Sequence, residues 1–600
     1  MPQLSKPLEH LQPSYDVVVI GSGYGGAVAA SRLARCGRKV CLLERGREIL
    51  PGQFPRTLAE ARKESQISSA KHHVGSDTAL FDVRLGEDIH VVVGCGLGGT
   101  SLINANVCLW PDERVFADAA WPVEIRGDGL LREGLARARR WLAPVPYNGP
   151  AKLDKVEAFR MAARVMKRDV KMVPLHISFE AGRNIANVEQ PACTLCGDCM
   201  TGCNIGAKTT TGHVYLPDAV HHGAEIFTEV EVRSLRKAAG GRWQVDCRRT
   251  GKKGAGTGGE LTVTADIVVL AAGTLGSTEI LLRSRDNGLA LSDQLGRRFT
   301  SNGDALANGY NNSVPVNGVG VGNPPKANVP PVGPAVASLI DLRDSERLED
   351  GLAICECALP CPTASILPAL LAPGAAVIGE QTGSLDLDAL ERTAASLLKG
   401  AYRGAVHNTQ TFLAVGHDQG DGVMGLVGDR IVISWPNCAQ QEVFKRGEEL
   451  FKRTVAATHG TYIPNPASTK MMGEKLMTVH PLGGCVMGSD AGNGVVNHKC
   501  QVFDGGAVGN PGGVHEGLYV CDGSVIPRSV GIHPLLTITA VTERAMIHAA
   551  IDKGWKFDAA ASPSAPPTRT TPVSPSANSK SGFFKSLFSG SRRKGHQAPQ

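Results

Sequence analysis

Short apolar runs along the chain mark candidate buried strands. Residues 15–20 and 39–43 are two such runs, and the stretch between them, 27–35, has the composition of a helix. Runs of the same kind recur at 267–270 and 518–521. Strands that are apolar on both faces are typical of parallel sheets covered by helices. The pattern predicts a single α/β core assembled from segments that lie far apart in the sequence.

The second half of the chain changes character several times. Residues 305–335 are crowded with Asn, Gly and Pro, which predicts a long irregular connection between domains. A helix is expected at 382–400 and alternating strands at 406–435. From residue 556 onward the chain is rich in Ser, Pro, Ala and Thr, which predicts a disordered tail over 556–600.

Within the predicted tail, residues 583–588 (Phe-Phe-Lys-Ser-Leu-Phe) are flanked by basic side chains. Two interpretations remain open: peripheral contact with a membrane surface or a docking partner, and an ordinary unstructured tail. No membrane span is expected in the rest of the chain. Its most apolar stretch, 364–379, is short and interrupted by Pro368, Pro373 and Gly374.

A glycine-rich turn joins the first strand to the first helix. Gly21, Gly23 and Gly26 occupy the glycine places of the G-x-G-x-x-G pattern, where they make the turn, admit a pyrophosphate and let the helix pack on the strand. The helix start also offers unpaired N–H groups to phosphates. Glu44 ends the second strand, where a carboxylate accepts hydrogen bonds from ribose hydroxyls. Together these features predict a dinucleotide site.

A second glycine-rich turn, 94–99, follows the apolar run 89–93 and precedes Thr100 and Asn104. A tight structural turn is one interpretation. A long cofactor that touches the protein at both ends explains two glycine turns better, because nothing in the sequence indicates two separate nucleotides.

Composition limits the classes of function. Hydrophobic residues make up 42% and charged residues 20% of the 600 positions, as in ordinary globular proteins. The net charge of +6 falls partly in the tail, so no nucleic-acid-binding face is expected. The chain starts without the apolar segment of a secretory signal, and its sixteen cysteines are therefore expected to be reduced. A cytoplasmic location is the prediction.

Four cysteines are spaced as in a bacterial ferredoxin segment: C-x2-C-x2-C-x3-C at Cys193, Cys196, Cys199 and Cys203. In two-cluster ferredoxins the fourth cysteine of such a run ligates the other cluster, and here no second run exists and no proline follows Cys203. Two interpretations remain open. The four cysteines could be ligands of a 4Fe-4S cluster, which would favour a dehydrogenase that passes electrons onward, or they could form a reduced loop without metal.

Three sequence signatures follow one another along the chain: GCGLGGTSLIN at 94–104, HPLGGCVMG at 480–488, and DGS at 522–524 with GIHPLLTIT at 531–539. Together and in this order they resemble the glucose–methanol–choline (GMC) oxidoreductase family, and the resemblance runs over residues 14–552. Within the family the sequence looks closest to the cholesterol oxidase branch, also on segments near 202–208 and 295–304. The resemblance is weakest over 305–470, where such enzymes shape their substrate pocket.

The resemblance implies an α/β, Rossmann-like FAD-binding domain that is discontinuous in sequence. It also implies an α+β substrate-binding domain with a largely antiparallel sheet. The FAD-binding domain is expected to combine 14–110, 200–304 and 471–552, and the substrate domain 111–199 and 305–470.

The resemblance also implies the residues that contact FAD, from the adenosine half to the ring. Val232 would cover the adenine, and Thr537 would open a helix beside the pyrophosphate and ribityl end. The complete expected set is Gly21, Gly23, Gly26, Glu44, Gly98, Gly99, Thr100, Asn104, Val232, Asp522, Gly523 and Thr537.

Two histidines, each followed by proline inside a matching signature, are the expected catalytic residues. The resemblance places His480 and His533 against the flavin ring, where a neutral imidazole accepts the hydroxyl proton as hydride leaves the carbon. The cholesterol oxidase branch usually has Asn at the place of His533, which makes a sterol assignment less secure. Glu356 resembles the active-site glutamate of that branch and would act as a base in an apolar pocket.

These features predict FAD-dependent oxidation of a secondary or long-chain alcohol, with sterols among the candidates, and with oxygen or another compound as electron acceptor. One alternative is an iron–sulfur flavoprotein whose main task is electron transfer. Another is a non-catalytic flavoprotein scaffold that docks through its tail.

Overall fold

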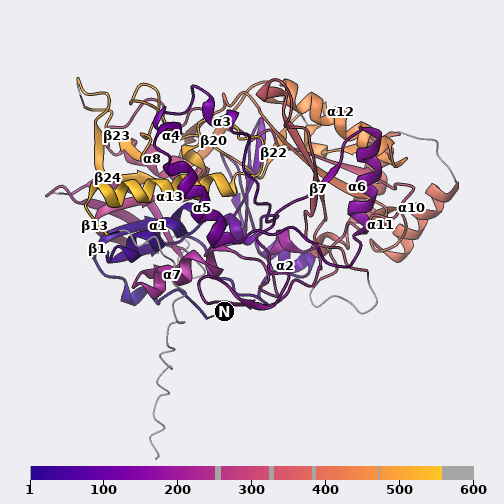
Figure 1. The fold of residues 1–600 in the computed structure, drawn as a ribbon, viewed down its shortest axis with the longest axis horizontal. Coiled ribbons are helices and arrows are strands. Elements are labelled where there is room, and N and C mark those ends of the chain that lie inside the picture. The colour runs from indigo at the N-terminus through magenta and orange to yellow at the C-terminus, as the bar shows by residue number, and fades with distance from the viewer. Residues whose placement is uncertain are drawn as a thin grey trace, which may run out of the picture. The chain divides into compact units, whose positions relative to one another are not determined.

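The computed structural model describes residues 2–238, 240–250, 259–322, 330–381, 387–470, 473–507 and 509–556. The segment 583–588, and with it the docking interpretation of the tail, lies outside these residues. One group of helices runs side by side: α1 (Tyr24–Arg35), α5 (Leu130–Leu142) and α13 (Leu535–Asp552) (Figure 1). A second group lies together elsewhere in the molecule: α6 (Asp154–Val165), α10 (Leu387–Lys399), α11 (Gly404–His407) and α12 (Glu442–Ala456) (Figure 1). The chain thus builds two regions of different architecture.

The first region is built on an eight-stranded sheet in which segments distant in sequence lie side by side. Its central strands are parallel, with Val18 of β1 opposite both Cys41 and Val268. These residues are fully buried, which explains their apolar character on both faces. The strands are β1 (Ser14–Ile20), β2 (Val40–Leu43), β10 (Glu225–Phe227), β11 (Val230–Lys237), β12 (Trp243–Arg249), β13 (Glu260–Leu270), β23 (Gln501–Phe503) and β24 (Val514–Val520).

Helices cover this sheet and pack closely on one another. A Cβ on Gly134 of α5 would lie 2.3 Å from the carbonyl oxygen of Ala540 in α13, so the two helix backbones meet where only glycine fits. Trp141 of α5 stacks on Tyr215 of α7 at 5.1 Å between ring centroids. The covering helices are α1 (Tyr24–Arg35), α5 (Leu130–Leu142), α7 (Tyr215–His221), α8 (Gly273–Asp286) and α13 (Leu535–Asp552).

The second region is built on a seven-stranded antiparallel sheet in the order β17-β21-β14-β18-β16-β15-β7. The ring of Phe412 lies between Phe159 of α6 and Phe451 of α12, so these two helices cover one face of the sheet. The strands are β7 (Val170–Met172), β14 (Ala305–Tyr310), β15 (Ser338–Asp341), β16 (Leu352–Cys357), β17 (Glu380–Gln381), β18 (Gln410–Gly416) and β21 (Thr461–Pro464).

The helices of the second region are α6 (Asp154–Val165), α9 (Leu367–Ile378), α10 (Leu387–Lys399), α11 (Gly404–His407) and α12 (Glu442–Ala456). Within the described residues no helix combines the length and the apolar character that a bilayer crossing requires. Together the two sheets confirm the predicted fold class, a Rossmann-like domain beside one with a largely antiparallel sheet.

Smaller sheets join the two regions. The five-stranded sheet pairs the strand that precedes the second glycine turn, β6, with β22, which precedes His480. Its strands are β3 (Ser65–Ser68), β4 (His73–Val74), β5 (Phe81–Leu85), β6 (Ile89–Gly94) and β22 (Leu476–Thr478). A hairpin of β19 (Val423–Val427) and β20 (Arg430–Ser434) and a short pair, β8 (Gly182–Arg183) and β9 (Glu189–Gln190), complete the strands.

The structure departs from the sequence expectations in two places. Residues 305–310, expected to be irregular, form β14 inside the antiparallel sheet, where pairing on both sides outweighs the low strand propensity of Asn and Gly. The segment 114–142, expected in the substrate domain, packs in the core of the eight-stranded sheet as α3 (Arg114–Ala117), α4 (Glu124–Gly127) and α5. Its buried aromatic residues, Phe116, Trp121 and Trp141, account for that placement.

Candidate active site

A cavity of about 1350 Å³ runs from the eight-stranded sheet to the antiparallel sheet. Most of the residues predicted to contact a cofactor or to act in catalysis line it, although they come from five separate stretches of the chain. They are Gly21, Gly23, Glu44, Gly99, Thr100, Asn104, Val232, His480, Asp522, Gly523 and His533.

The two glycine-rich turns meet at one end of this cavity. A Cβ on Gly99 would lie 3.1 Å from the Cα of Gly23, so the turns touch backbone to backbone. Ser22 links them: its hydroxyl accepts a hydrogen bond from the N–H of Gly98 at 2.8 Å and donates one to the carboxylate of Glu44 at 2.6 Å. One continuous backbone cradle results, as expected for a single long ligand touched by both turns.

Three predicted contact residues do not line the cavity. A Cβ on Gly26 would lie 2.0 Å from the carbonyl oxygen of Gly21, so this glycine serves close packing of helix on strand. Gly98 has a φ of 120°, which the tight second turn requires. Thr537 is fully buried, and its hydroxyl oxygen has no hydrogen-bond partner among the described residues.

Asp522 has its carboxylate fully engaged by the protein. One oxygen accepts from the N–H of Gly273 at 2.9 Å and the hydroxyl of Ser277 at 2.5 Å, and the other accepts from the N–H of Ser524 at 2.9 Å. These bonds join the turn after β13 to the segment after β24. Asp522 therefore shapes the cavity wall.

His480 is held by a carboxylate on its inner side. Its Nδ1 lies 2.7 Å from Asp304, whose other oxygen accepts from the backbone N–H of His480 at 3.1 Å and of Val479 at 2.9 Å. A carboxylate can only accept hydrogen bonds, so Nδ1 of His480 carries the proton. In the neutral ring, Nε2 is then left as an acceptor at the cavity wall.

His533 lies next to His480, with 4.9 Å between ring centroids and 79° between ring planes. Neither of its ring nitrogens has a hydrogen-bond partner among the described residues, although the side chain is buried. Burial, with smaller contributions from the charges of His480 and Arg343, holds the pKa of His533 well below the ordinary value. His533 is therefore a neutral imidazole that offers one donor and one acceptor to a ligand.

One short segment positions both histidine loops. Asn302 accepts from the N–H groups of Val530 and Gly531 at 2.8 and 3.1 Å and donates to the carbonyl of Ile532 at 2.8 Å, directly before His533. Asp304, two residues later, holds His480. The sequence expectations included Asn302 and Asp304 only as part of a family-like segment. An uncharged amide and a carboxylate two residues apart carry no local signal of this role.

Asn106 is another residue that the sequence expectations did not name as a site residue. It lines the cavity, is fully buried, and has no hydrogen-bond partner for either side-chain polar atom among the described residues. Buried amides of this kind are normally satisfied, so the atoms are available to a ligand. Its place two residues after Asn104 was the available signal.

Glu356, predicted as a catalytic base, does not reach the histidines. It is absent from the cavity wall, which its neighbour Cys357 lines, because successive residues of β16 point to opposite faces. Glu356 is fully buried and pairs with Lys155 of α6 at 2.5 Å, while its other oxygen accepts from the N–H of Ala337 and Ser338. It acts as an anchor between helix and sheet.

The wall beside the two histidines is apolar and comes largely from the antiparallel sheet. Cys357 of β16 and Leu413 of β18 line the cavity. The two strands are neighbours in the antiparallel sheet, where Leu413 is directly opposite Cys355. Further apolar side chains of the cavity lining include Ile103, Val107, Met200, Leu306, Val336 and Leu359. A hydrophobic group of the ligand is therefore accommodated next to the imidazoles.

The four cysteines of the ferredoxin-like run lie outside the large cavity. Cys193, Cys196, Cys199 and Cys203 line a second, smaller cavity, together with Cys361 from a distant part of the chain. Burial raises the pKa of the Cys193 thiol to about 12, so this thiol is not an activated nucleophile.

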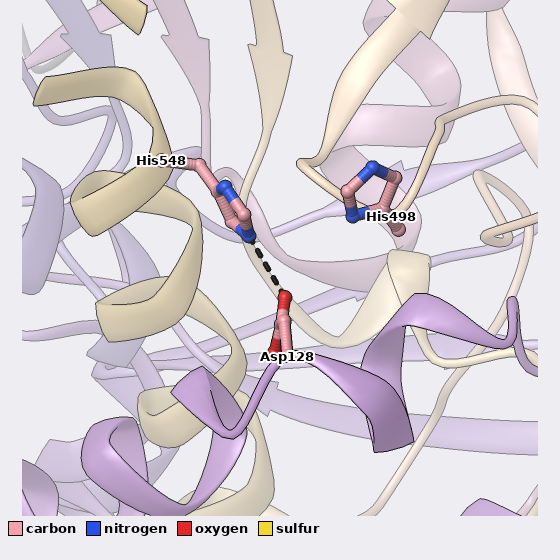
Figure 2. Close-up of side chains that lie close together, drawn as sticks. All are labelled: Asp128, His498 and His548. Carbon is pink, nitrogen blue, oxygen red and sulfur yellow. Dashed lines mark hydrogen bonds and ion pairs between the residues drawn. The ribbon is translucent and has the colours of Figure 1, made fainter. Parts of the chain in front are cut away.

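A further group of potential metal ligands lies far from the cavity lining. Asp128, His498 and His548 approach one another within 4.8 Å (Figure 2). The guanidinium of Arg544 already occupies the charge-compensating place, because it binds the carboxylate of Asp128 and lies 3.0 Å from Nδ1 of His498. This arrangement is a structural ion-pair cluster.

Comparison with known proteins identifies relatives over most of the chain. Residues 15–301 and 438–542 match the N- and C-terminal models of one family, GMC oxidoreductase. A cholesterol oxidase of Mycobacterium tuberculosis is 26% identical, covering 89% of this chain and 91% of that protein. A cholesterol oxidase of Acinetobacter baumannii is 25% identical, with 89% and 94% covered.

More distant likenesses extend the comparison. A long-chain-alcohol oxidase of Arabidopsis thaliana is 22% identical, covering 87% of this chain and 65% of that protein. The solved structure of a fungal aryl-alcohol oxidase superposes with a TM-score of 0.55 at 16% identity, covering 91% of this chain and 100% of that one. At this identity the structural likeness establishes a shared fold.

Proposed function

We infer the function from one premise: the chain belongs to the GMC oxidoreductase family and is an FAD-dependent oxidoreductase acting on CH–OH donors. We propose that it oxidises an apolar secondary or long-chain alcohol to the carbonyl. In this proposal His480 and His533 handle the hydroxyl proton. The single observation that carries it is a pair of imidazoles whose free nitrogens face a cavity with an apolar wall.

The residues of the cavity fit FAD. The double glycine cradle would hold the pyrophosphate, Glu44 the ribose and Val232 the adenine, as the sequence predicts. The unpartnered buried polar atoms of Asn104 and Asn106, which line the cavity, are suited to the polar parts of the flavin. When bound, the flavin supplies the acceptor for the hydride that leaves the alcohol carbon.

The two histidines divide the work on the alcohol oxygen. Asp304 fixes the proton of His480 on Nδ1, so Nε2 is the acceptor for the hydroxyl proton. His533 stays neutral because it is buried, and its N–H can donate to the same oxygen and hold it in place. The carboxylate beside His480 also stabilises the imidazolium that forms when the proton arrives.

The apolar wall supports a hydrophobic substrate. Met200, Leu359 and Leu413 offer no charged partner to a sugar or a small polar alcohol. Sterols and long-chain alcohols are the substrates named for two groups of relatives, and both have a large hydrophobic part. Glu356, the predicted base, lies outside the cavity and so is not placed to move a proton of the carbonyl product. We therefore expect the carbonyl product to be released without rearrangement.

An anaerobic screen tests this function. The purified holoenzyme would be mixed with sterols, long-chain primary alcohols, secondary alcohols, aryl alcohols and sugars, and the loss of flavin absorbance followed. We expect bleaching by one of the hydrophobic classes and none by sugars. Bleaching by sugars alone, or by no alcohol, would contradict the proposal. Product analysis by mass spectrometry would separate simple oxidation from oxidation with isomerisation.

A further inference from the structure

The cysteine-lined cavity has free space between its sulfur-bearing walls. The centres of water-sized molecules can occupy about 30 Å³ of it, more than one water needs. Within the described residues no three of its sulfurs lie within 4.8 Å of one another. A tetrahedral zinc ion requires its thiolates about 3.8 Å apart. The described sulfurs therefore do not form a preformed zinc site, whereas the ligands of a cluster bind separate irons and need not converge on one point.

The loop that carries the sulfurs is held in an unusual conformation. Leu195 has a φ of 57°, in the left-handed region that costs energy for a side chain of this size, and Gly197 has a φ of 85°. Two backbone N–H groups point at sulfur, each at 3.4 Å: Leu195, within the curl, donates to Cys193, and Ala335, from a distant segment, donates to Cys199. Hydrogen bonds to the sulfurs are among the features that tune iron–sulfur clusters.

A buried positive charge lies against the same loop. The ammonium of Lys208 donates to the carbonyl oxygens of Cys199 at 3.1 Å, Leu102 at 3.1 Å and Asn104 at 2.7 Å, and its side chain is almost completely buried. In the part of the chain that the structure describes, Lys208 forms no ion pair with a carboxylate. A buried ammonium without an anion is costly, and an anionic cluster would supply the missing partner.

We propose that Cys193, Cys196, Cys199 and Cys203 ligate a 4Fe-4S cluster in this cavity. The proposal goes beyond alcohol oxidation and does not depend on it. The cluster would lie next to the proposed flavin site, because Met200 lines the large cavity while its neighbour Cys199 lines the small one. Lys208 links the two sites through the carbonyl of Asn104, a predicted flavin contact.

Cys361 is the matched control within the same cavity. Its sulfur lies 3.6 Å from the hydroxyl oxygen of Tyr402 and 3.9 Å from the carbonyl oxygen of Arg56, so it is engaged away from the loop. Its backbone N–H, which a serine keeps, donates to Asp198 at 2.7 Å and ties the two segments together. Cys361→Ser changes a cavity-lining thiol without removing a proposed ligand.

The test is a metal analysis of the full chain purified without oxygen. Iron, acid-labile sulfide, zinc and FAD would be measured per chain, and the dithionite-reduced protein examined by electron paramagnetic resonance. We expect about four iron and four sulfide per chain, with a resonance typical of a reduced cluster. A protein that carries FAD but no iron and sulfide, or that carries one zinc in their place, would overturn the proposal. Either result would leave the proposed alcohol oxidation standing.

Variants then test the ligands themselves. Cys196→Ser and Cys203→Ser should each lower the iron content at least severalfold while FAD remains bound, and Cys361→Ser should keep the iron. Full iron in Cys196→Ser, or loss of iron only in Cys361→Ser, would show that the assigned ligands are wrong. The wild-type iron and sulfide content decides the cluster itself even if a variant does not fold.

Discussion

Two histidine pairs in this protein have almost the same geometry and different surroundings. The ring centroids of His480 and His533 lie 4.9 Å apart, with 79° between the ring planes. For His498 and His548 the centroid distance is 5.3 Å and the angle between the planes is 87°. In the second pair Arg544 and Asp128 satisfy the ring nitrogens that face inward. In the first pair both nitrogens of His533 lack a partner among the described residues.

The comparison shows that ring geometry alone does not define a site. Buried polar atoms are nearly always satisfied, so a buried imidazole without a partner next to a cavity indicates a missing ligand. A pair that is already bound to an arginine and a carboxylate is complete and contributes to stability. The same two kinds of side chain thus leave ring nitrogens open beside the cavity in one place and join an ion-pair cluster in the other.

The largest expected effect comes from replacing a histidine of the pair His480 and His533, which we call the open pair because the nitrogens of His533 lack a partner among the described residues. His480→Asn should slow anaerobic flavin reduction by about 10² to 10⁴-fold, because the acceptor of the hydroxyl proton is lost, with FAD still bound. The matched variant His498→Asn should leave the rate unchanged. Stopped-flow absorbance measures both. Equal rates in wild type and His480→Asn would remove the distinction between the pairs.

The pair His498 and His548, which we call the closed pair, is bound to the carboxylate of Asp128. Replacing this carboxylate should affect stability instead of the rate of flavin reduction. Asp128→Ala leaves the guanidinium of Arg544, which is 1% exposed, without its ion pair. Loss of a partner for a buried charge should lower the free energy of unfolding by roughly 3 kcal/mol. Urea denaturation measures this change, and flavin reduction in the folded variant should keep its wild-type rate. A stable variant with slow reduction would contradict the structural role.

Asp304 is the carboxylate bound to His480 of the open pair. Its replacement should lower the catalytic rate. Asp304→Asn removes a charge-assisted hydrogen bond worth about 1.5–3 kcal/mol, which corresponds to a fall of roughly tenfold to a hundredfold in rate. Because Asp304 orients His480 and does not touch substrate, kcat should fall while KM and FAD content stay near wild type. A parallel loss of FAD would mark a merely structural role.

A fifth histidine, His417, sharpens the comparison through pH. His417 is buried against Gly531 in the His533 loop, and burial lowers its pKa to about 4. Since the pKa in the unfolded chain is higher, near 6.5, the unfolded state binds the proton first as pH falls, and folding stability is lost between about pH 6.5 and 4.

The stability of wild type relative to His417→Asn should therefore shrink by roughly 2 kcal/mol from pH 7.5 to pH 5. Thermal or urea unfolding of both proteins at the two pH values measures the difference. Using the variant as reference cancels the titration of other groups. A difference that stays constant or grows on acidification would contradict a buried neutral His417.

The sequence indicated the cofactor-binding half of the fold well, because its signals are local. The run at 15–20 lies within β1, the helix predicted at 27–35 forms the later part of α1, and both glycine turns occur where the pattern places them. A fully apolar strand and a glycine at a fixed place are consequences of burial and close approach. They can be recognised without knowing what packs on them.

The sequence could not show features that depend on register or on long-range packing. Whether Glu356 faces the cavity or α6 is decided by the phase of β16 in the sheet, and one residue either way reverses it. Asp304 and His480 are 176 positions apart in the sequence, and only the folded chain brings them together. The expected cytoplasmic location, the electron acceptor and the domain boundaries, apart from the placement of 114–142, stay predictions.

The most direct test of the central claim is the flavin content and redox response of the purified chain. We predict about one FAD per chain, bound in the double glycine cradle, and complete anaerobic bleaching by a hydrophobic alcohol. A folded protein that binds no FAD, or whose bound FAD no alcohol reduces, would contradict the account.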